Sequence, residues 1–118
     1  MPKKERRKRT EIAVSVGKAI QEQRKLVGLT QPQVAELIGG VEKETISRLE
    51  TGTISQTVER LQMLSDALNC PITRFFLPEG EKKSVYAVTI ADMLDTLPAD
   101  RQESIVKCVA EMVRALKK

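Results

Sequence analysis

The chain contains no histidine and no tryptophan, and three of its 118 residues are aromatic. Without histidine, Cys70 and Cys108 lack the partner ligands of a common zinc site. We therefore expect two separate, reduced, buried thiols and no metal or other cofactor. The sequence has no glycine-rich phosphate loop followed by lysine, and neither cysteine has an activating base nearby. These absences predict that the protein is not an enzyme.

The chain also lacks a run of about 18 apolar residues, which a membrane-spanning helix would need. Its first residues are charged and do not resemble a signal sequence. Together these features predict a cytoplasmic protein without membrane attachment. With 41% hydrophobic residues and few aromatics, the chain can form one domain with a modest aliphatic core and an appendage. The fold class we expect is all-α.

The most informative stretch of the chain lies between residues 31 and 52. Apolar residues recur there at helical spacing on both sides of Gly39-Gly40, at Val34, Leu37, Ile38, Ile46 and Leu49. The two glycines permit the positive φ of a tight turn, and Thr30 is a suitable N-cap for the first segment. Helices this short are not stable alone in water, so both must pack on neighbouring elements. The pattern predicts a helix-turn-helix.

In order, the residues of this region resemble the lambda-repressor-like DNA-binding domain of phage Cro and cI repressors and of the Xre family. The matching residues are Gly28-Leu29-Thr30-Gln31, Val34-Ala35, Ile46-Ser47-Arg48-Leu49-Glu50 and Gly52, then Leu61, Leu64, Ala67 and Leu68. The resemblance covers about residues 17 to 76 and implies a five-helix DNA-binding domain of bacterial or phage origin. Gly39-Gly40 makes the turn one residue longer than the family usually has.

The resemblance also implies which residues meet DNA. The helix at residues 42–50 is expected to lie in the major groove. Ile46 and Leu49 are expected to form its buried side, which leaves the other side chains of the helix to point outward. The side chains expected to contact bases are Lys43, Glu44, Ser47 and Arg48. Arg48 has the donors that guanine O6 and N7 accept. Those expected to contact phosphates are Gln31, Thr45, Thr51 and Thr53. Arg24 is expected to pair with Glu50, as in the family.

Helices are also predicted on both sides of this motif. Residues 10–27 have Thr10 as a candidate N-cap and Gly28 as a stop. Residues 57–68 form the next predicted helix, capped by Thr57 and followed by Asn69 as a left-handed stop. We expect its inward-facing residues to include Val58, Leu61 and Leu64, and we expect Phe75 and Phe76 to close the core.

Positive charge is concentrated at the N-terminus. Residues 1–9 carry six basic residues and one acid, whereas residues 10–76 carry seven basic and eight acidic residues and residues 77–118 carry seven of each. A charged block with no apolar residue beyond Met1 predicts a disordered arm. The arm either neutralises nucleic-acid phosphates or acts as a solubilising tail. Its basic residues are Lys3, Lys4, Arg6, Arg7, Lys8 and Arg9.

Turn-forming and charged residues at 78–84 predict a linker between a domain at 10–77 and a C-terminal helical segment at 85–118. Residues 84–89 alternate weakly and suggest an extended stretch, followed by a short helix to residue 96. Pro98 then leads into a last helix, whose apolar stripe comprises Ile105, Val106, Val109, Met112, Val113 and Leu116. We expect this stripe to form a homodimer interface. The alternative is that the helix folds back on its own DNA-binding domain.

Taken together, these features predict a homodimeric regulator that binds double-stranded DNA sequence-specifically. It would act as a repressor at an inverted-repeat operator with half-sites about 34 Å apart. The alternative is a protein-interaction module of the same fold, such as an antitoxin or adaptor with a polypeptide partner. The near-neutral folded domain and the two glutamates Glu42 and Glu44 favour that alternative. No small-molecule ligand is evident.

Overall fold

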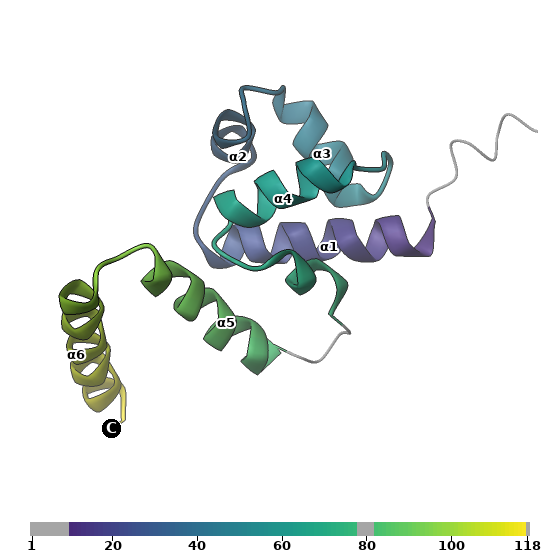
Figure 1. Ribbon diagram of the computed structural model, residues 1–118. Coiled ribbons are helices and arrows are strands. Elements are labelled where there is room, and N and C mark those ends of the chain that lie inside the picture. Colours follow the sequence, from purple (N-terminus) through teal and green to yellow (C-terminus); the bar gives the residue numbers. More distant parts are fainter. Residues whose placement is uncertain (1–9, 78–81, 118) are drawn as a thin grey trace, which may run out of the picture.

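The computed structural model describes residues 10–77 and 82–117, and every regular element within them is helical (Figure 1). The order is α1 (Glu11–Leu26), α2 (Gln31–Leu37), α3 (Lys43–Thr51), α4 (Val58–Ala67), the short 3₁₀-helix η2 (Ile72–Phe76), α5 (Lys82–Asp95) and α6 (Ala99–Leu116). The all-α prediction is therefore confirmed, with α1 to α4 and η2 forming the five-helix unit. The basic arm at 1–9 and residues 78–81 of the predicted linker lie outside the described residues.

The helix ends follow the local signals in the sequence. The Thr10 hydroxyl accepts a hydrogen bond from Ala13 N at 3.1 Å, and the Thr57 hydroxyl accepts one from Arg60 N at 3.0 Å. Each satisfies a backbone donor that the first turn of a helix leaves without a partner. Gly28, after α1, and Asn69, after α4, have φ values of +79° and +59°. Both are left-handed stops, as predicted.

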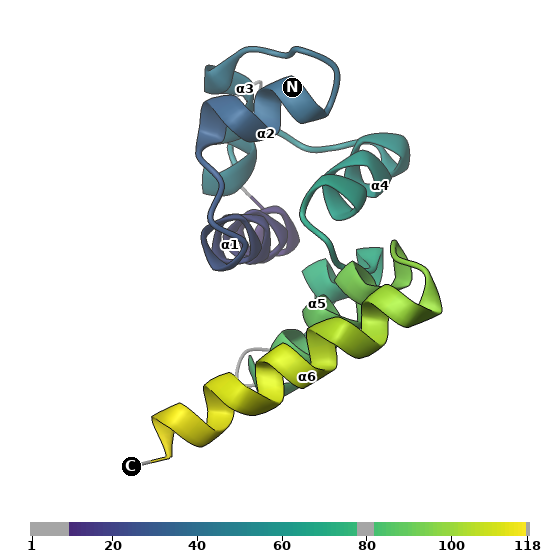
Figure 2. The same ribbon diagram turned by 90° about the vertical axis from the view of Figure 1, so that its left-hand side faces the viewer.

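The core lies where α1 packs against α3 and η2, with α2 and α4 closing the other sides (Figure 2). Its fully buried side chains are almost all aliphatic and include Ile20, Val34, Ile46, Leu64 and Phe75. Three expected core residues are not buried, and the first is Leu37, which is 59% exposed at the end of α2. Val58 is 71% exposed because it lies at the first position of α4, before the helix reaches the core. Phe76 is 52% exposed because consecutive residues of η2 point to different sides, and Phe75 takes the inward position.

The segment after residue 81 is helical from its first described residue. α5 begins at Lys82, so residues 84–89 are not extended, and the last residues of the predicted linker belong to a helix. Val85 and Thr89, one helical turn apart, are both buried. The buried residues are therefore four apart, as in a helix, and not two apart, as the predicted extended stretch would require. Contact with the preceding domain selects the helical periodicity that the short stretch alone does not specify.

α6 projects from the end of α5 and lies away from α1 to α4 in both views (Figures 1 and 2). None of its residues is buried. The arrangement is elongated, with principal extents of 60 × 30 × 21 Å. α6 therefore does not fold back on the domain formed by α1 to α4 and η2, which was the alternative to a dimer interface. No helix in the described part of the chain has the length and apolar character needed to cross a lipid bilayer.

The two cysteines have different environments. Cys70, just after α4, is buried, whereas Cys108 on α6 is exposed. The prediction of two buried thiols is therefore wrong for Cys108, because no described element of the chain covers that part of α6. Burial raises the pKa of the Cys70 thiol to about 12, and the nearby Arg74 guanidinium offsets only part of that effect.

Candidate nucleic-acid interface

α2 and α3 are joined by a turn that two glycines make possible. The Thr30 hydroxyl accepts a hydrogen bond from Gln33 N, and Gln33 Oε1 accepts one from Thr30 N, which forms a capping box at the start of α2. After α2, Gly39 and Gly40 take φ values of +108° and +81°. Glu42 is the N-cap of α3, which starts at Lys43. The longer turn is thus absorbed by two left-handed glycines, and the recognition helix follows it at the expected place.

α3 is held against α1 by an unusually close backbone contact. A Cβ placed on Gly17 would lie 2.3 Å from Leu49 O and 2.7 Å from Glu50 O. A Cβ on Gly52, just after α3, would lie 2.7 Å from Val14 Cα. Both ends of this contact therefore need residues without side chains. The close approach buries Ile46 and Leu49 and turns the opposite side of α3 outward.

A buried polar network fixes the end of α3. The Glu50 carboxylate accepts from Arg24 Nε at 2.5 Å and from Arg24 Nη2 at 3.1 Å. It also accepts from Gln31 Nε2 at 3.0 Å, and Arg24 Nη1 donates to Leu29 O at 2.9 Å. The predicted pairing of Arg24 with Glu50 is confirmed, and the structure shows that it is fork-shaped. It connects α1, the first residue of α2 and the C-terminal turn of α3 in one set of bonds.

The four side chains predicted to contact bases lie on α3 as the helical spacing requires. Lys43, Glu44 and Arg48 are exposed, and Ser47 is half-buried. Because Ile46 and Leu49 face the core, the exposed three form the outer face of the helix. This face carries two cations beside the carboxylates of Glu44 and the N-cap Glu42, so it offers specific donors without a strong net positive charge.

The residues predicted to contact phosphates are more engaged within the domain. The Gln31 amide donates to Glu50, so any phosphate contact would need its second N–H. The hydroxyls of Thr51 and Thr53 lie 2.7 Å apart, and Thr51 Oγ1 also donates to Arg48 O at 3.2 Å. Thr45 is half-buried. The side chains of Gln31, Thr51 and Thr53 therefore make hydrogen bonds within the domain, beside α3. The predicted basic arm lies outside the described residues.

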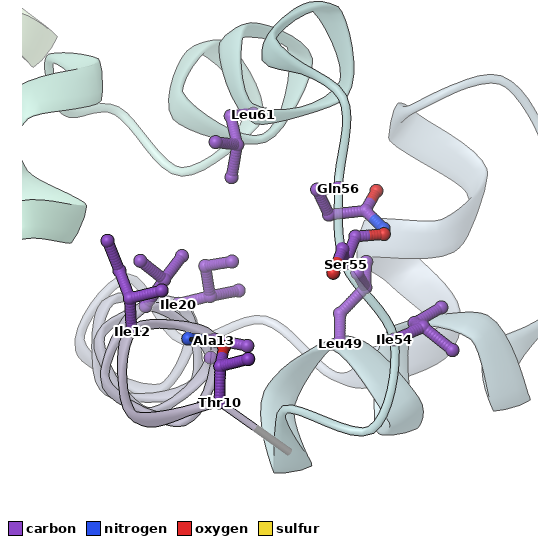
Figure 3. Close-up of a pocket in the computed structure, with 11 residues that line it drawn as sticks. Thr10, Ile12, Ala13, Ile20, Leu49, Ile54, Ser55, Gln56 and Leu61 are labelled. Atoms are coloured by element: carbon purple, nitrogen blue, oxygen red, sulfur yellow. Dashed lines mark hydrogen bonds between the residues drawn. The ribbon is translucent and has the colours of Figure 1, made fainter. Parts of the chain in front are cut away.

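A small recess lies beside α3, between the first turns of α1 and the loop that leads into α4 (Figure 3). Its volume is about 150 Å³. Leu49, Ile20 and Leu61 form part of its apolar wall, while Thr10, Ser55 and Gln56 contribute polar atoms. Leu49 belongs to α3, so the wall of this recess is also part of the support for the recognition helix.

The predicted dimer residues on α6 are accessible. Ile105, Met112, Val113 and Leu116 are exposed, with Leu116 at 84% and Met112 at 57%, and Val109 is half-buried. A second apolar row, which sequence reasoning missed, follows α5 at Tyr86, Ile90 and Met93. Its i, i+4, i+7 spacing was the available signal, but the reading of residues 84–89 as extended concealed it.

Residues 20–75 match the protein-family model described as Helix-turn-helix. This range runs from the middle of α1 to η2, so it contains the capped α2, the glycine turn, α3 and the Arg24–Glu50 pair. We found no significant match among curated proteins or solved structures.

Proposed function

We propose that this chain is a homodimeric repressor of an inverted-repeat operator, and that residues 20–75, which match the Helix-turn-helix family model, form its DNA-binding domain of the lambda-repressor-like, Xre type. The observation that carries the proposal is the outward face of α3. Lys43, Glu44 and Arg48 are exposed there, while the helix behind them is held by buried contacts and the Arg24–Glu50 pair.

Base reading is assigned to the exposed side chains of α3. Arg48 donates two parallel N–H groups to guanine O6 and N7, and Lys43 serves as a point donor to a guanine acceptor. Glu44 accepts from a cytosine N4 amine. A face with mixed charge suits this role, because its affinity depends on matched donors and acceptors more than on bulk attraction to phosphates.

Homodimerisation is proposed through the C-terminal helices. No residue of α6 is buried within the described chain, and the row of α5 at Tyr86, Ile90 and Met93 is exposed as well. A second copy of the chain presents the same two rows, so both would be covered by one two-fold contact. Such a contact would place two α3 helices for half-sites about one helical turn apart.

Repression follows from this geometry by occlusion. The described part of the chain consists of the DNA-binding domain and two helices. The most direct action of a dimer of this size on transcription is to cover a promoter and exclude other proteins from it.

The experiment that tests the proposal is a selection of random duplex DNA on the full-length protein at two salt concentrations. We expect an inverted-repeat motif that persists at the higher salt, because base contacts are less salt-dependent than phosphate contacts. The same selection with Arg48→Ala should lose the motif. Binding without sequence preference, abolished by salt, would contradict the proposal and would favour a protein-interaction module with a polypeptide partner.

A further inference from the structure

Gln23 on α1 is a fully buried polar side chain shared by four elements. Its Nε2 donates to Leu68 O at the end of α4 and to Thr89 Oγ1 on α5, both at 2.9 Å. Its Oε1 accepts from Arg74 Nε of η2 at 3.1 Å. Both amide hydrogens and the carbonyl oxygen are therefore used. Through this one side chain, α5 is connected to three elements of the DNA-binding domain.

The remainder of the α5 contact is small. Among the described side chains of α5, those of Val85 and Thr89 are buried, and its other apolar row faces outward. An apolar contact of that size tolerates sliding or rotation of the helix. The hydrogen bond does not, because any shift of α5 by one turn would leave the buried Gln23 N–H without an acceptor. Gln23 therefore specifies the register of α5 on the domain.

The connection continues from α5 into α6. Gln102 Nε2 on α6 donates to Leu94 O at 2.8 Å and to Leu97 O at 2.9 Å, which fixes the corner after α5. The two carbonyls belong to the last turn of α5 and the connection after it, which would otherwise need water. Gln23 and Gln102 thus link α1, α5 and α6 into one path with defined geometry.

We propose that Gln23 and Thr89 are positioning residues that orient the dimerisation helices on the DNA-binding domain and thereby select the spacing between operator half-sites. The inference rests on the proposed function, since it concerns the dimer that would hold two α3 helices. With α5 fixed, the distance and rotation between the two α3 helices are fixed. With α5 loose, the same two domains reach half-sites at several spacings.

The test compares Thr89→Val, which removes the hydroxyl at constant shape, with Thr89→Ser, which keeps it. Each full-length protein is titrated with a single half-site duplex and with duplexes whose two half-sites are separated by different numbers of base pairs. Hydrogen exchange of the α5 amides is measured on the same proteins without DNA. We expect the original protein and Thr89→Ser to prefer one spacing by roughly tenfold, comparable to the effect of one mismatched base pair.

For Thr89→Val we expect the spacing preference to disappear and the α5 amides to exchange faster, while affinity for the single half-site stays unchanged. An unchanged spacing preference with unchanged α5 exchange would overturn the inference. Equal loss of affinity for every duplex, half-site included, would also overturn it, since that pattern indicates damage to the domain itself. If even the original protein binds no duplex specifically, the proposed function fails, and α5 exchange alone then decides whether this hydrogen bond anchors the helix.

Discussion

Arg48, which we propose contacts a base, has an exposed side chain on a backbone that is held by hydrogen bonds. The side chain is exposed, whereas its carbonyl oxygen accepts from Thr51 Oγ1 and from the backbone N–H groups of Gly52 and Thr53. Truncation of the side chain leaves these backbone bonds in place. Substitution of this residue can therefore test the proposed base contact with little effect on folding stability.

We predict that Arg48→Ala weakens specific binding by about 1 to 3 kcal/mol per half-site, because one bidentate base contact is lost. The free energy of unfolding should change by less than about 0.5 kcal/mol, as for other exposed positions. Titration of operator and non-specific duplexes measures the first, and chemical denaturation measures the second. A large loss of folding stability would show that the side chain faces the core.

The two thiols should differ sharply in reactivity. Only the thiolate is nucleophilic, and burial raises the pKa of Cys70 to about 12, so almost none is ionised at neutral pH. We predict that Cys108→Ser leaves a protein whose remaining thiol reacts with a chromogenic disulfide reagent only after denaturation. Fast labelling of that variant in its folded state would contradict the burial of Cys70.

At the scale of elements, the contact between α1 and α3 depends on the absence of a side chain. Glycine within a helix is usually destabilising relative to alanine by about 1 kcal/mol. At position 17 we expect the opposite, with alanine less stable than glycine. An added Cβ would meet the carbonyl oxygens of Leu49 and Glu50, which are backbone atoms of α3. A backbone cannot yield as the end of a flexible side chain can.

We predict that Gly17→Ala lowers the free energy of unfolding by about 1 to 3 kcal/mol or more, through overpacking. Ser15→Ala, on the exposed side of the same helix, serves as the control and should be neutral or slightly stabilising. Thermal and chemical denaturation of the two variants measure the difference. Stabilisation by Gly17→Ala would show that α1 and α3 can separate at little cost.

Local signals predicted the capped ends of α1, α2 and α4 and the left-handed stops, because each depends on a few neighbouring residues such as Thr10, Thr30 and Asn69. The Arg24–Glu50 pair came from the family resemblance. Gln23 and α5 could not be predicted in the same way. Gln23 is separated from its partner Thr89 by 66 residues, and a lone glutamine on a helix gives no sign that it will be buried.

Docking of α5 on the domain also places the carboxylate of Asp92 in a partly buried position near other carboxylates. Burial raises the pKa of Asp92, with the nearby carboxylates of Asp95 and Asp66 adding to the effect. Because the folded-state pKa is raised, folding is favoured while Asp92 is protonated, and this contribution is lost as the pH rises from the ordinary value of 3.8 through the raised one. At neutral pH the charged carboxylate therefore opposes docking.

We predict that Asp92→Asn increases the free energy of unfolding at pH 7 by less than about 1 kcal/mol, since the group is partly solvated. The difference between the two proteins should shrink as the pH is lowered toward 3.8, where Asp92 itself becomes neutral. Chemical denaturation of both proteins between pH 7 and 3.8 measures this difference in unfolding free energy. A variant less stable than the original at pH 7 would mean that the carboxylate has a favourable partner.

At the scale of the whole molecule, the surfaces proposed for DNA recognition and for dimerisation lie at different ends of an elongated chain. The outward face of α3 belongs to the domain, and the apolar rows belong to α5 and α6, which lie away from α3 (Figures 1 and 2). Residues 10–76 carry one more acidic than basic residue, so long-range attraction to DNA from this part is weak. In the proposed homodimer, two linked domains would compensate for this weak attraction, because the second half-site would be bound at high effective concentration.

Assembly can be tested without disturbing the fold, because the residues that would form the interface are exposed in the single chain. Met112 is 57% exposed, so Met112→Asp should leave the helices of one chain intact. In a dimer it would place an unpaired carboxylate in an apolar contact, which costs several kcal/mol. We predict that light scattering shows the original protein at twice the chain mass of 13.2 kDa and Met112→Asp at that mass. Ser104→Asp adds the same charge off the apolar row and should remain dimeric. If Met112→Asp also remains dimeric, then α6 is not the interface and the two recognition helices must be joined through another surface.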